Sequence, residues 1–141
     1  MRFWDSSAIV PLVVVEAASA RLVAYVAESN PMYIWWSTRI EVTAALTRRE
    51  RADARRDADW SACFLALNEM AEDWREVLPT DPVRRSAERL LRRHDLCAVA
   101  SLQLAAALIA CDDLPSGQEF ICLDARLRRA AAAEGFRLLP P

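Results

Sequence analysis

Three acidic residues, far apart in the sequence, stand where catalytic carboxylates could meet. Asp5 and Asp124 each follow a short apolar run, and Glu41 lies one helical turn beyond the run that ends at Trp36. If these runs are parallel strands, a ligand would bind just beyond their carboxyl ends. Clustered carboxylates raise one another's pKa, and a hard divalent cation such as Mg²⁺ or Mn²⁺ relieves that repulsion. Asp5, Glu41 and Asp124 are therefore candidate site residues.

Each of these acids also has a purely structural interpretation. Asp5 and Asp124 stand where helix N-caps stand, and aspartate is a favoured N-cap. Thr38 and Glu41 have the spacing of a capping box, in which Glu41 would accept from a backbone N–H at the helix start. Spacing alone leaves both interpretations open.

The elements that would position these acids are short strands alternating with helices. Apolar runs predict strands at residues 2–4, 33–36, 76–78, 120–123 and 136–139. Helical spacing and capping signals predict helices at residues 17–28, 39–51, 55–76, 81–93, 96–111 and 125–134. This alternation predicts an α/β fold with a parallel sheet, and the absence of repeats and linkers predicts a single domain over residues 1–141.

The charge of the chain is nearly balanced, but its cations are all of one kind. The net charge is −2, so no global positive field indicates nucleic acid. All 18 basic residues are arginine, and two groups of them are dense: residues 48–56 and residues 84–93. These groups are either solvated helical faces or phosphate contacts, for which the planar guanidinium is well suited.

Cysteine and histidine usage excludes several kinds of site. The four cysteines form no C-x-x-C pair and His94 is the only histidine, which excludes zinc-finger spacings and a two-histidine ribonuclease mechanism. Arg2 and Asp5 interrupt the N-terminus before an export signal could begin, so we expect reduced cysteines and a cytoplasmic protein. The uncharged run at residues 96–111 is too short to span a membrane, and we expect no membrane association.

Four local motifs, in order along nearly the whole chain, resemble those of PIN-domain ribonucleases of the VapC toxin type. The first is Asp5-Ser6-Ser7-Ala8, and the second is the stretch at residues 39–46 that contains Glu41. The third, at residues 98–108, is similar to the pattern A-x-D-A-L-[HQ]-L-A-x-A-L. The fourth, at residues 120–127, is similar to F-x-[TC]-x-D-x-x-L and contains Asp124.

The resemblance implies a fold and a function. The fold would be a PIN-like three-layer sandwich, a short central parallel sheet flanked by helices. The activity would be that of a Mg²⁺- or Mn²⁺-dependent endoribonuclease toxin, which cuts RNA and is held by a cognate antitoxin. The family pattern assigns the catalytic site to Asp5, Glu41, position 100 and Asp124, with Asp5, position 100 and Asp124 as metal ligands. It also implies a homodimer, and an apolar hairpin around residues 40–75 is the candidate antitoxin surface.

One position departs from this pattern. Ala100 stands where the resemblance implies an aspartate that binds metal, and a methyl group cannot bind a cation. Either an engineered replacement or a natural loss would produce this sequence. We expect this chain, with alanine at position 100, to be an impaired nuclease.

Two other functions remain as alternatives. A catalytically silent PIN-like module would bind RNA or an antitoxin without cutting. A phosphatase-like or dehalogenase-like enzyme would use Asp5 as its nucleophile, but such enzymes generally have an acid or threonine two residues later, where this chain has Ser7.

Overall fold

A parallel five-stranded sheet lies at the centre of the computed structural model, which describes residues 1–28 and 31–141. Its strands are β1 (Arg2–Trp4), β2 (Met32–Trp35), β3 (Arg75–Val77), β4 (Glu119–Ile121) and β5 (Arg137–Leu139). They lie in the order β3-β2-β1-β4-β5, and every neighbouring pair is parallel. The predicted α/β class is confirmed.

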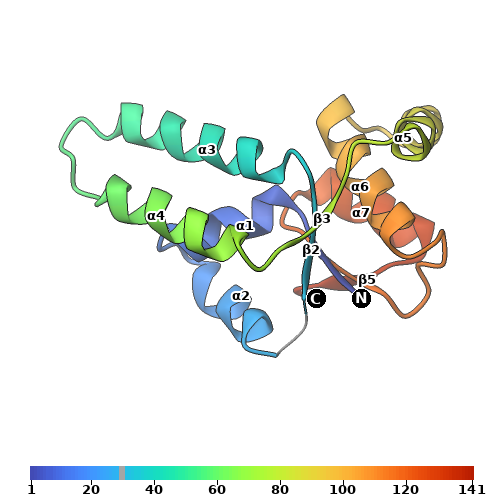
Figure 1. Ribbon diagram of the computed structural model, residues 1–141, viewed down its shortest axis with the longest axis horizontal. Helices are drawn as coiled ribbons and strands as arrows, with labels where there is room; N and C mark the ends of the chain where they lie inside the picture. Colours follow the sequence, from blue (N-terminus) through green and yellow to red (C-terminus); the bar gives the residue numbers. More distant parts are fainter. Residues whose placement is uncertain (29–30) are drawn as a thin grey trace.

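Helices cover both faces of this sheet, so the fold has three layers (Figure 1). On one side lie α1 (Ser6–Val13), α2 (Ser19–Val26), α3 (Thr38–Ala52) and α4 (Trp60–Ala71). On the other side lie α5 (Asp81–Arg93), α6 (Ala98–Ala110) and α7 (Ala125–Glu134). This is the three-layer arrangement that the motifs imply.

The strands separate two hydrophobic cores because successive side chains of a strand point to opposite faces. Phe3 and Phe120 are fully buried in the core beneath α5, α6 and α7, and their rings stack at 5.5 Å. Trp4 and Ile121, one residue later in each strand, are buried in the core beneath α1 to α4. Covering both faces explains why the strands are continuous apolar runs.

The helix predicted at residues 55–76 is wrong at both ends. The observed helix α4 begins at Trp60 because Asp59 caps it, accepting from the backbone N–H of Ala62 at 3.0 Å. Ahead of it the backbone turns, with Arg56 at a φ of 52°. After α4 the chain enters β3 at Arg75, where pairing with β2 replaces helical hydrogen bonds. Tertiary pairing therefore overrides the apolar periodicity of this segment.

No helix within residues 1–28 and 31–141 is both long and apolar enough to cross a bilayer.

Candidate active site

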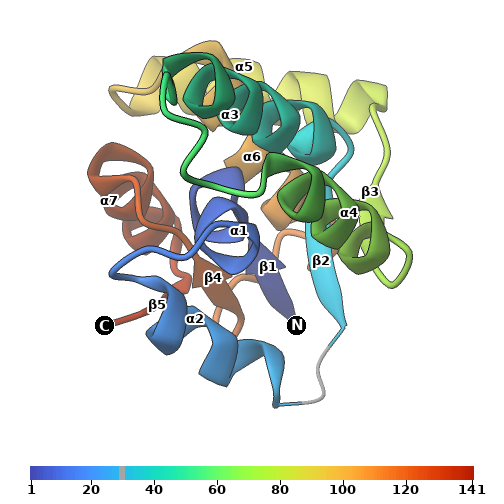
Figure 2. The same cartoon turned by 90° about the vertical axis from the view of Figure 1, so that its left-hand side faces the viewer.

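The carboxyl ends of the central strands β1 and β4 lie among four helices, α1, α3, α6 and α7 (Figure 2). The backbone N–H of Asp5 bonds to the carbonyl of Ile121 at 2.9 Å, which aligns the two strand ends. Asp5 and Asp124 each follow one of these strands and each caps the next helix. The sheet topology therefore brings these two distant segments together.

Asp5 is the most buried of the candidate acids, with 4% of its surface exposed. Its Oδ2 accepts hydrogen bonds from the backbone N–H and the hydroxyl of Ser7, and from Sγ of Cys122 at 3.5 Å. Burial raises the pKa of Asp5; the Ser7 bonds oppose this effect, and the charge of Glu41 adds to it. The site therefore penalises the ionised form of Asp5.

Glu41 lies in the first turn of α3, but it does not complete a capping box. Its Oε1 accepts from the hydroxyl of Ser37 at 2.7 Å, and its Oε2 accepts from Nε2 of Gln103 at 3.0 Å. The capping-box interpretation of Thr38 and Glu41 is therefore wrong. The reason is that α6 offers Glu41 a buried amide, which takes the place of the local backbone donor.

Asp124 is exposed and begins α7. Its Oδ1 accepts from the backbone N–H of Leu127 at 2.8 Å, the usual N-cap bond. The N-cap interpretation of Asp5 and Asp124 thus holds in the structure. The N-cap bond of Asp124 uses only its Oδ1 and leaves Oδ2 available. An N-cap role and a catalytic role are therefore compatible.

Position 100 lies on α6, one turn before Gln103. Ala100 is partly buried, whereas Gln103 has only 1% of its surface exposed. The Gln103 Nε2 donates to Oγ1 of Thr38 at 3.1 Å as well as to Glu41. Its Oε1 is buried, with no hydrogen-bond partner among the described residues. Helix α6 therefore carries both Ala100 and the buried amide that holds Glu41.

All four predicted positions line one pocket of about 180 Å³, which we call the acid pocket. No arginine or histidine of the described chain lines it, so its acids have no basic partner there. Its lining is Asp5, Ser6, Ser7, Glu41, Cys97, Val99, Ala100, Gln103, Asp124 and Leu127. The structure thus brings the predicted residues together, and their catalytic role stays a prediction.

The residues now present do not fit a divalent cation. Within residues 1–28 and 31–141, no three aspartate, glutamate, histidine or cysteine side chains lie close enough together to hold one. Cys122 adds no ligand, because burial raises the pKa of its thiol far above neutrality and leaves it a hydrogen-bond donor to Asp5. A site built from carboxylates alone needs another acid here.

Sequence reasoning did not single out the polar residues that hold this site together. The Ser7 hydroxyl donates to Asp5 and accepts from the backbone N–H of Leu123 at 2.9 Å, which joins the ends of β1 and β4. Gln103 links α6 to α3. The sequence did offer one signal: Gln103 and Ser101 are the two polar residues of a helix whose other side chains are all apolar, and a buried amide needs hydrogen-bond partners.

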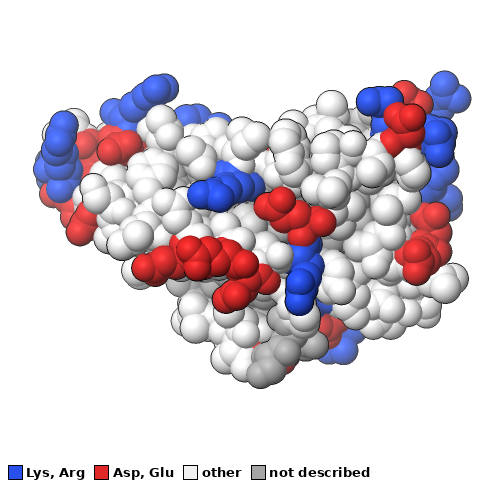
Figure 3. All heavy atoms as spheres, in the orientation of Figure 1, with Lys and Arg blue, Asp and Glu red and all other residues white. Residues whose placement is uncertain are grey.

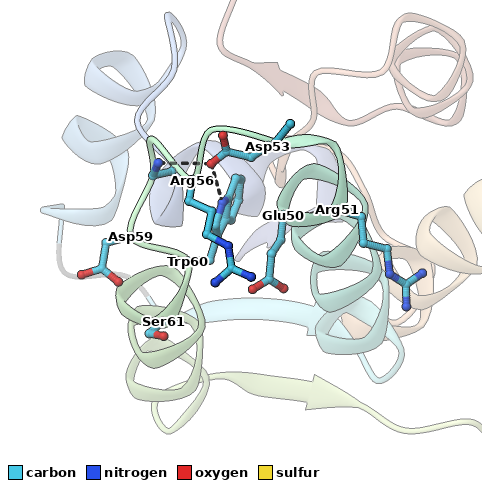
Figure 4. Close-up of a pocket in the computed structure, with 9 residues that line it drawn as sticks. Glu50, Arg51, Asp53, Arg56, Asp59, Trp60 and Ser61 are labelled. Carbon is cyan, nitrogen blue, oxygen red and sulfur yellow. Dashed lines mark hydrogen bonds between the residues drawn. The ribbon is translucent and has the colours of Figure 1, made fainter.

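A larger pocket lies away from the acid pocket, at the turn between α3 and α4 (Figure 4). It measures about 520 Å³ and is lined by none of the four predicted positions. Asp53 organises the turn by accepting from the indole N–H of Trp60 at 2.8 Å and from the backbone N–H groups of Asp57 and Ala58 at 3.2 Å. These contacts assign Asp53, one of the polar residues that line this pocket, to the structure of the turn.

Comparisons with known proteins support the fold. A crystal structure of PAE2754 from Pyrobaculum aerophilum matches with a TM-score of 0.66 and 17% identity, over 98% of this chain and 88% of that chain. A crystal structure of FitAcB from Neisseria gonorrhoeae matches with a TM-score of 0.58 and 14% identity, over 97% of each chain. The chain has a PIN-like fold.

Sequence comparisons add nothing to this likeness. No protein-family model matches the chain, and no curated protein matches it. At these identities, the structural likeness concerns the fold alone.

Proposed function

We propose that this chain is an endoribonuclease toxin of the PIN type whose metal site is left incomplete by Ala100. The observation that carries the proposal is the acid pocket itself. Asp5, Glu41 and Asp124 line it with no basic residue among the described lining, and burial raises the pKa of Asp5. Keeping unpaired carboxylates together costs stability, which a merely structural site would avoid.

The missing acid belongs on α6, where it would face this pocket. Ala100 lines the pocket together with the other three positions, so an aspartate there would add a fourth carboxylate to the same space. The family pattern places a metal ligand at this position. The proposed cation is Mg²⁺ or Mn²⁺, because both prefer oxygen ligands.

The proposed partners follow the same resemblance: an RNA substrate, a cognate antitoxin and a second copy of the chain, in the cytoplasm. The hairpin formed by α3 and α4 is the proposed antitoxin surface. It carries two exposed apolar side chains, Ile40 at 60% and Leu65 at 57%. A partner that covers these two side chains would remove their apolar surface from water.

The Ala100→Asp variant tests the activity. We expect it to cut total cellular RNA when Mg²⁺ or Mn²⁺ is present, to stop when EDTA is added, and to slow the growth of cells that lack an antitoxin. Ala100→Asn is the matched control, because asparagine has nearly the same shape but no charge. Circular dichroism should establish that both variants are folded.

A second candidate function is a catalytically silent module that binds RNA or an antitoxin. It is favoured because no three metal-binding side chains lie together among the described residues. The same experiment separates the two functions. If the Ala100→Asp protein is folded and binds metal but leaves all RNA intact, the nuclease proposal fails and the silent module replaces it.

A further inference from the structure

A groove continues from the acid pocket along helix α3. It measures about 380 Å³ and shares Ser6, Ser7, Glu41 and Val99 with the acid pocket. Its remaining lining is Val10, Ala44, Ala45 and Arg48. We call this space the α3 groove. It extends the acid pocket past the small side chains of Ala44 and Ala45.

Arg48 stands at the far end of the α3 groove from Glu41. The two residues are seven positions apart on one helix, which places them on the same side and roughly 10 Å apart along its axis. Arg48 is exposed, and it forms no ion pair with a carboxylate in the part of the chain that the structure describes. Its guanidinium is therefore available to an external anion.

Another pocket, the α7 pocket, is formed by α7 and the end of α5, on the opposite face of the sheet from α3 (Figure 1). It measures about 220 Å³ and is lined by Arg93, His94, Asp95, Arg126, Arg129 and Ala130. The α7 pocket and the acid pocket are neighbours along the chain. Arg126 of the α7 pocket comes two residues after Asp124 of the acid pocket, and Asp95 comes two residues before Cys97. The acids are thus flanked by basic groups on both sides.

The cations of the α7 pocket exceed its carboxylates. Three arginines line it, and one of them, Arg93, already pairs with Glu134 at 3.6 Å. Asp95 is its one acidic lining residue and lies 3.8 Å from Arg126 with both side chains exposed. Exposed ion pairs of this kind are weak, so Arg126 can exchange its partner for another anion. Arg129 is exposed and has no carboxylate partner among the residues described. The pocket suits a phosphate.

We propose that a single strand of RNA lies across the acid pocket, with Arg48 holding backbone phosphate on one flank and Arg126 with Arg129 holding it on the other. This inference rests on the proposed function and assigns its positioning residues. The acids between the two flanks repel a phosphate, so the attraction that places RNA there must come from the flanks. Arginine pairs with phosphate through two parallel N–H bonds, which orients the strand as well as attracting it.

The walls of the α3 groove favour RNA over an acidic peptide. Ala44, Ala45 and Val99 form a low apolar surface between Glu41 and Arg48, against which a base or a ribose can pack. The remaining arginines of the two dense groups, at the α3–α4 tip and on α5, lie at the two ends of the molecule, whereas the two flanking pockets adjoin the acid pocket (Figure 3). The two flanking pockets are therefore the better track for a phosphate backbone.

The test measures RNA binding, which does not depend on cleavage. Fluorescence anisotropy would follow a labelled single-stranded RNA of roughly a dozen nucleotides binding to the chain as written, in EDTA, over a range of salt concentrations. The variants are Arg48→Ala and the double variant Arg126→Ala/Arg129→Ala. The matched controls are Arg21→Ala and Arg21→Ala/Arg75→Ala, since these exposed arginines lie on α2 and at the start of β3.

Each lost phosphate contact should reduce the slope of log affinity against log salt by about 0.7. We expect that reduction for Arg48→Ala, with binding about fivefold weaker at 0.1 M salt, and twice the reduction in slope for the double variant. Arg48→Lys keeps the charge and should restore the slope. The control variants should bind RNA with the slope of the unaltered chain.

Three results would overturn the inference. In the first, either flank variant binds RNA like its matched control. In the second, polyglutamate of equal charge displaces the labelled RNA as well as unlabelled RNA does, which would assign the flanks to an acidic peptide. In the third, the chain does not bind RNA even at low salt. The first result together with RNA cleavage by Ala100→Asp would remove only the track and leave the proposed function in place.

Discussion

The amide nitrogen of Gln103 lies 3.0 Å from Oε2 of Glu41, and this bond joins helix α6 to helix α3 near the carboxyl ends of the strands. Gln103 lies one helical turn after Ala100, so the helix that carries Ala100 also orients Glu41. The hydroxyl of Ser37 holds the other oxygen of Glu41 at 2.7 Å. Glu41 is therefore held in place whether or not position 100 is acidic.

This arrangement predicts the effect of Glu41→Gln in the Ala100→Asp background. Glutamine can still accept a hydrogen bond, so we expect the fold to be kept. The lost charge should reduce RNA cleavage by at least about 100-fold, because removing even a supporting group at a metal site costs about 10–100-fold. Cleavage rates and thermal unfolding should be measured on the same preparations. Full cleavage by the double variant would make Glu41 a structural residue.

Metal binding should depend on position 100 in the same way. We expect calorimetry with Mn²⁺ to detect weak or no binding to the chain as written, and binding at least about 10-fold tighter to Ala100→Asp. The physical reason is one additional carboxylate in a pocket that already holds three acids. The Ala100→Asn variant controls for the change in size. Micromolar affinity in the chain as written would contradict this prediction.

The burial of Asp5 predicts a pH-dependent effect of Asp5→Asn. Burial raises the pKa of Asp5, so the folded chain holds this proton more tightly than the unfolded chain does. The protonated Asp5 therefore contributes its full stability at pH values below the pKa that Asp5 has in the unfolded chain. That contribution is lost as pH rises through the pKa that Asp5 has in the folded chain. We therefore expect Asp5→Asn to match the unaltered chain at about pH 3 and to exceed its stability at about pH 8, in metal-free buffer.

Urea unfolding at a series of pH values checks this prediction. Asp124→Asn is a suitable control, because Asp124 is also an N-cap but is exposed. Asparagine caps helices as well as aspartate does, so the control should differ by less than about 0.5 kcal/mol at neutral pH. A constant difference between Asp5→Asn and the unaltered chain at every pH would rule out a buried, destabilised carboxylate.

Arg128 and Arg129 are neighbours with different expected effects on stability. Arg128 donates to the carbonyls of Cys122, Leu139 and Pro140, at 2.8, 3.3 and 2.7 Å, and so ties the C-terminus to the end of β4. Removing the cation leaves the carbonyls of Cys122 and Pro140 without this donor, whereas the carbonyl of Leu139 keeps the backbone N–H of Cys122 at 3.1 Å. We expect Arg128→Ala to lower the free energy of unfolding by about 1.5–3 kcal/mol, and the exposed Arg129→Ala to change it by less than about 0.5 kcal/mol. Equal effects in urea unfolding would contradict this account.

Much of the fold could be predicted because its signals are local. Asp81-Pro82 starts a helix, Gly135 ends one with a φ of 109°, and both occur in the structure where the sequence places them. The failure at residues 55–76 has a different origin. There the periodicity is helical, but the helix begins only at Trp60, after its N-cap Asp59. The end of the segment pairs with β2 as strand β3. The spacing of apolar residues indicates neither the N-cap at Asp59 nor the pairing with β2.

The sequence by itself determined which acids stand at strand ends, because strand and cap signals depend on neighbours along the chain. Only the tertiary structure decided how those acids are held. It buries Asp5 and gives Glu41 an amide donor 62 residues away in place of a backbone N–H. It also places arginines on both flanks of the acid pocket. Desolvation and charge interactions depend on every group nearby in space, and the parallel order of β2, β1 and β4 sets which groups those are.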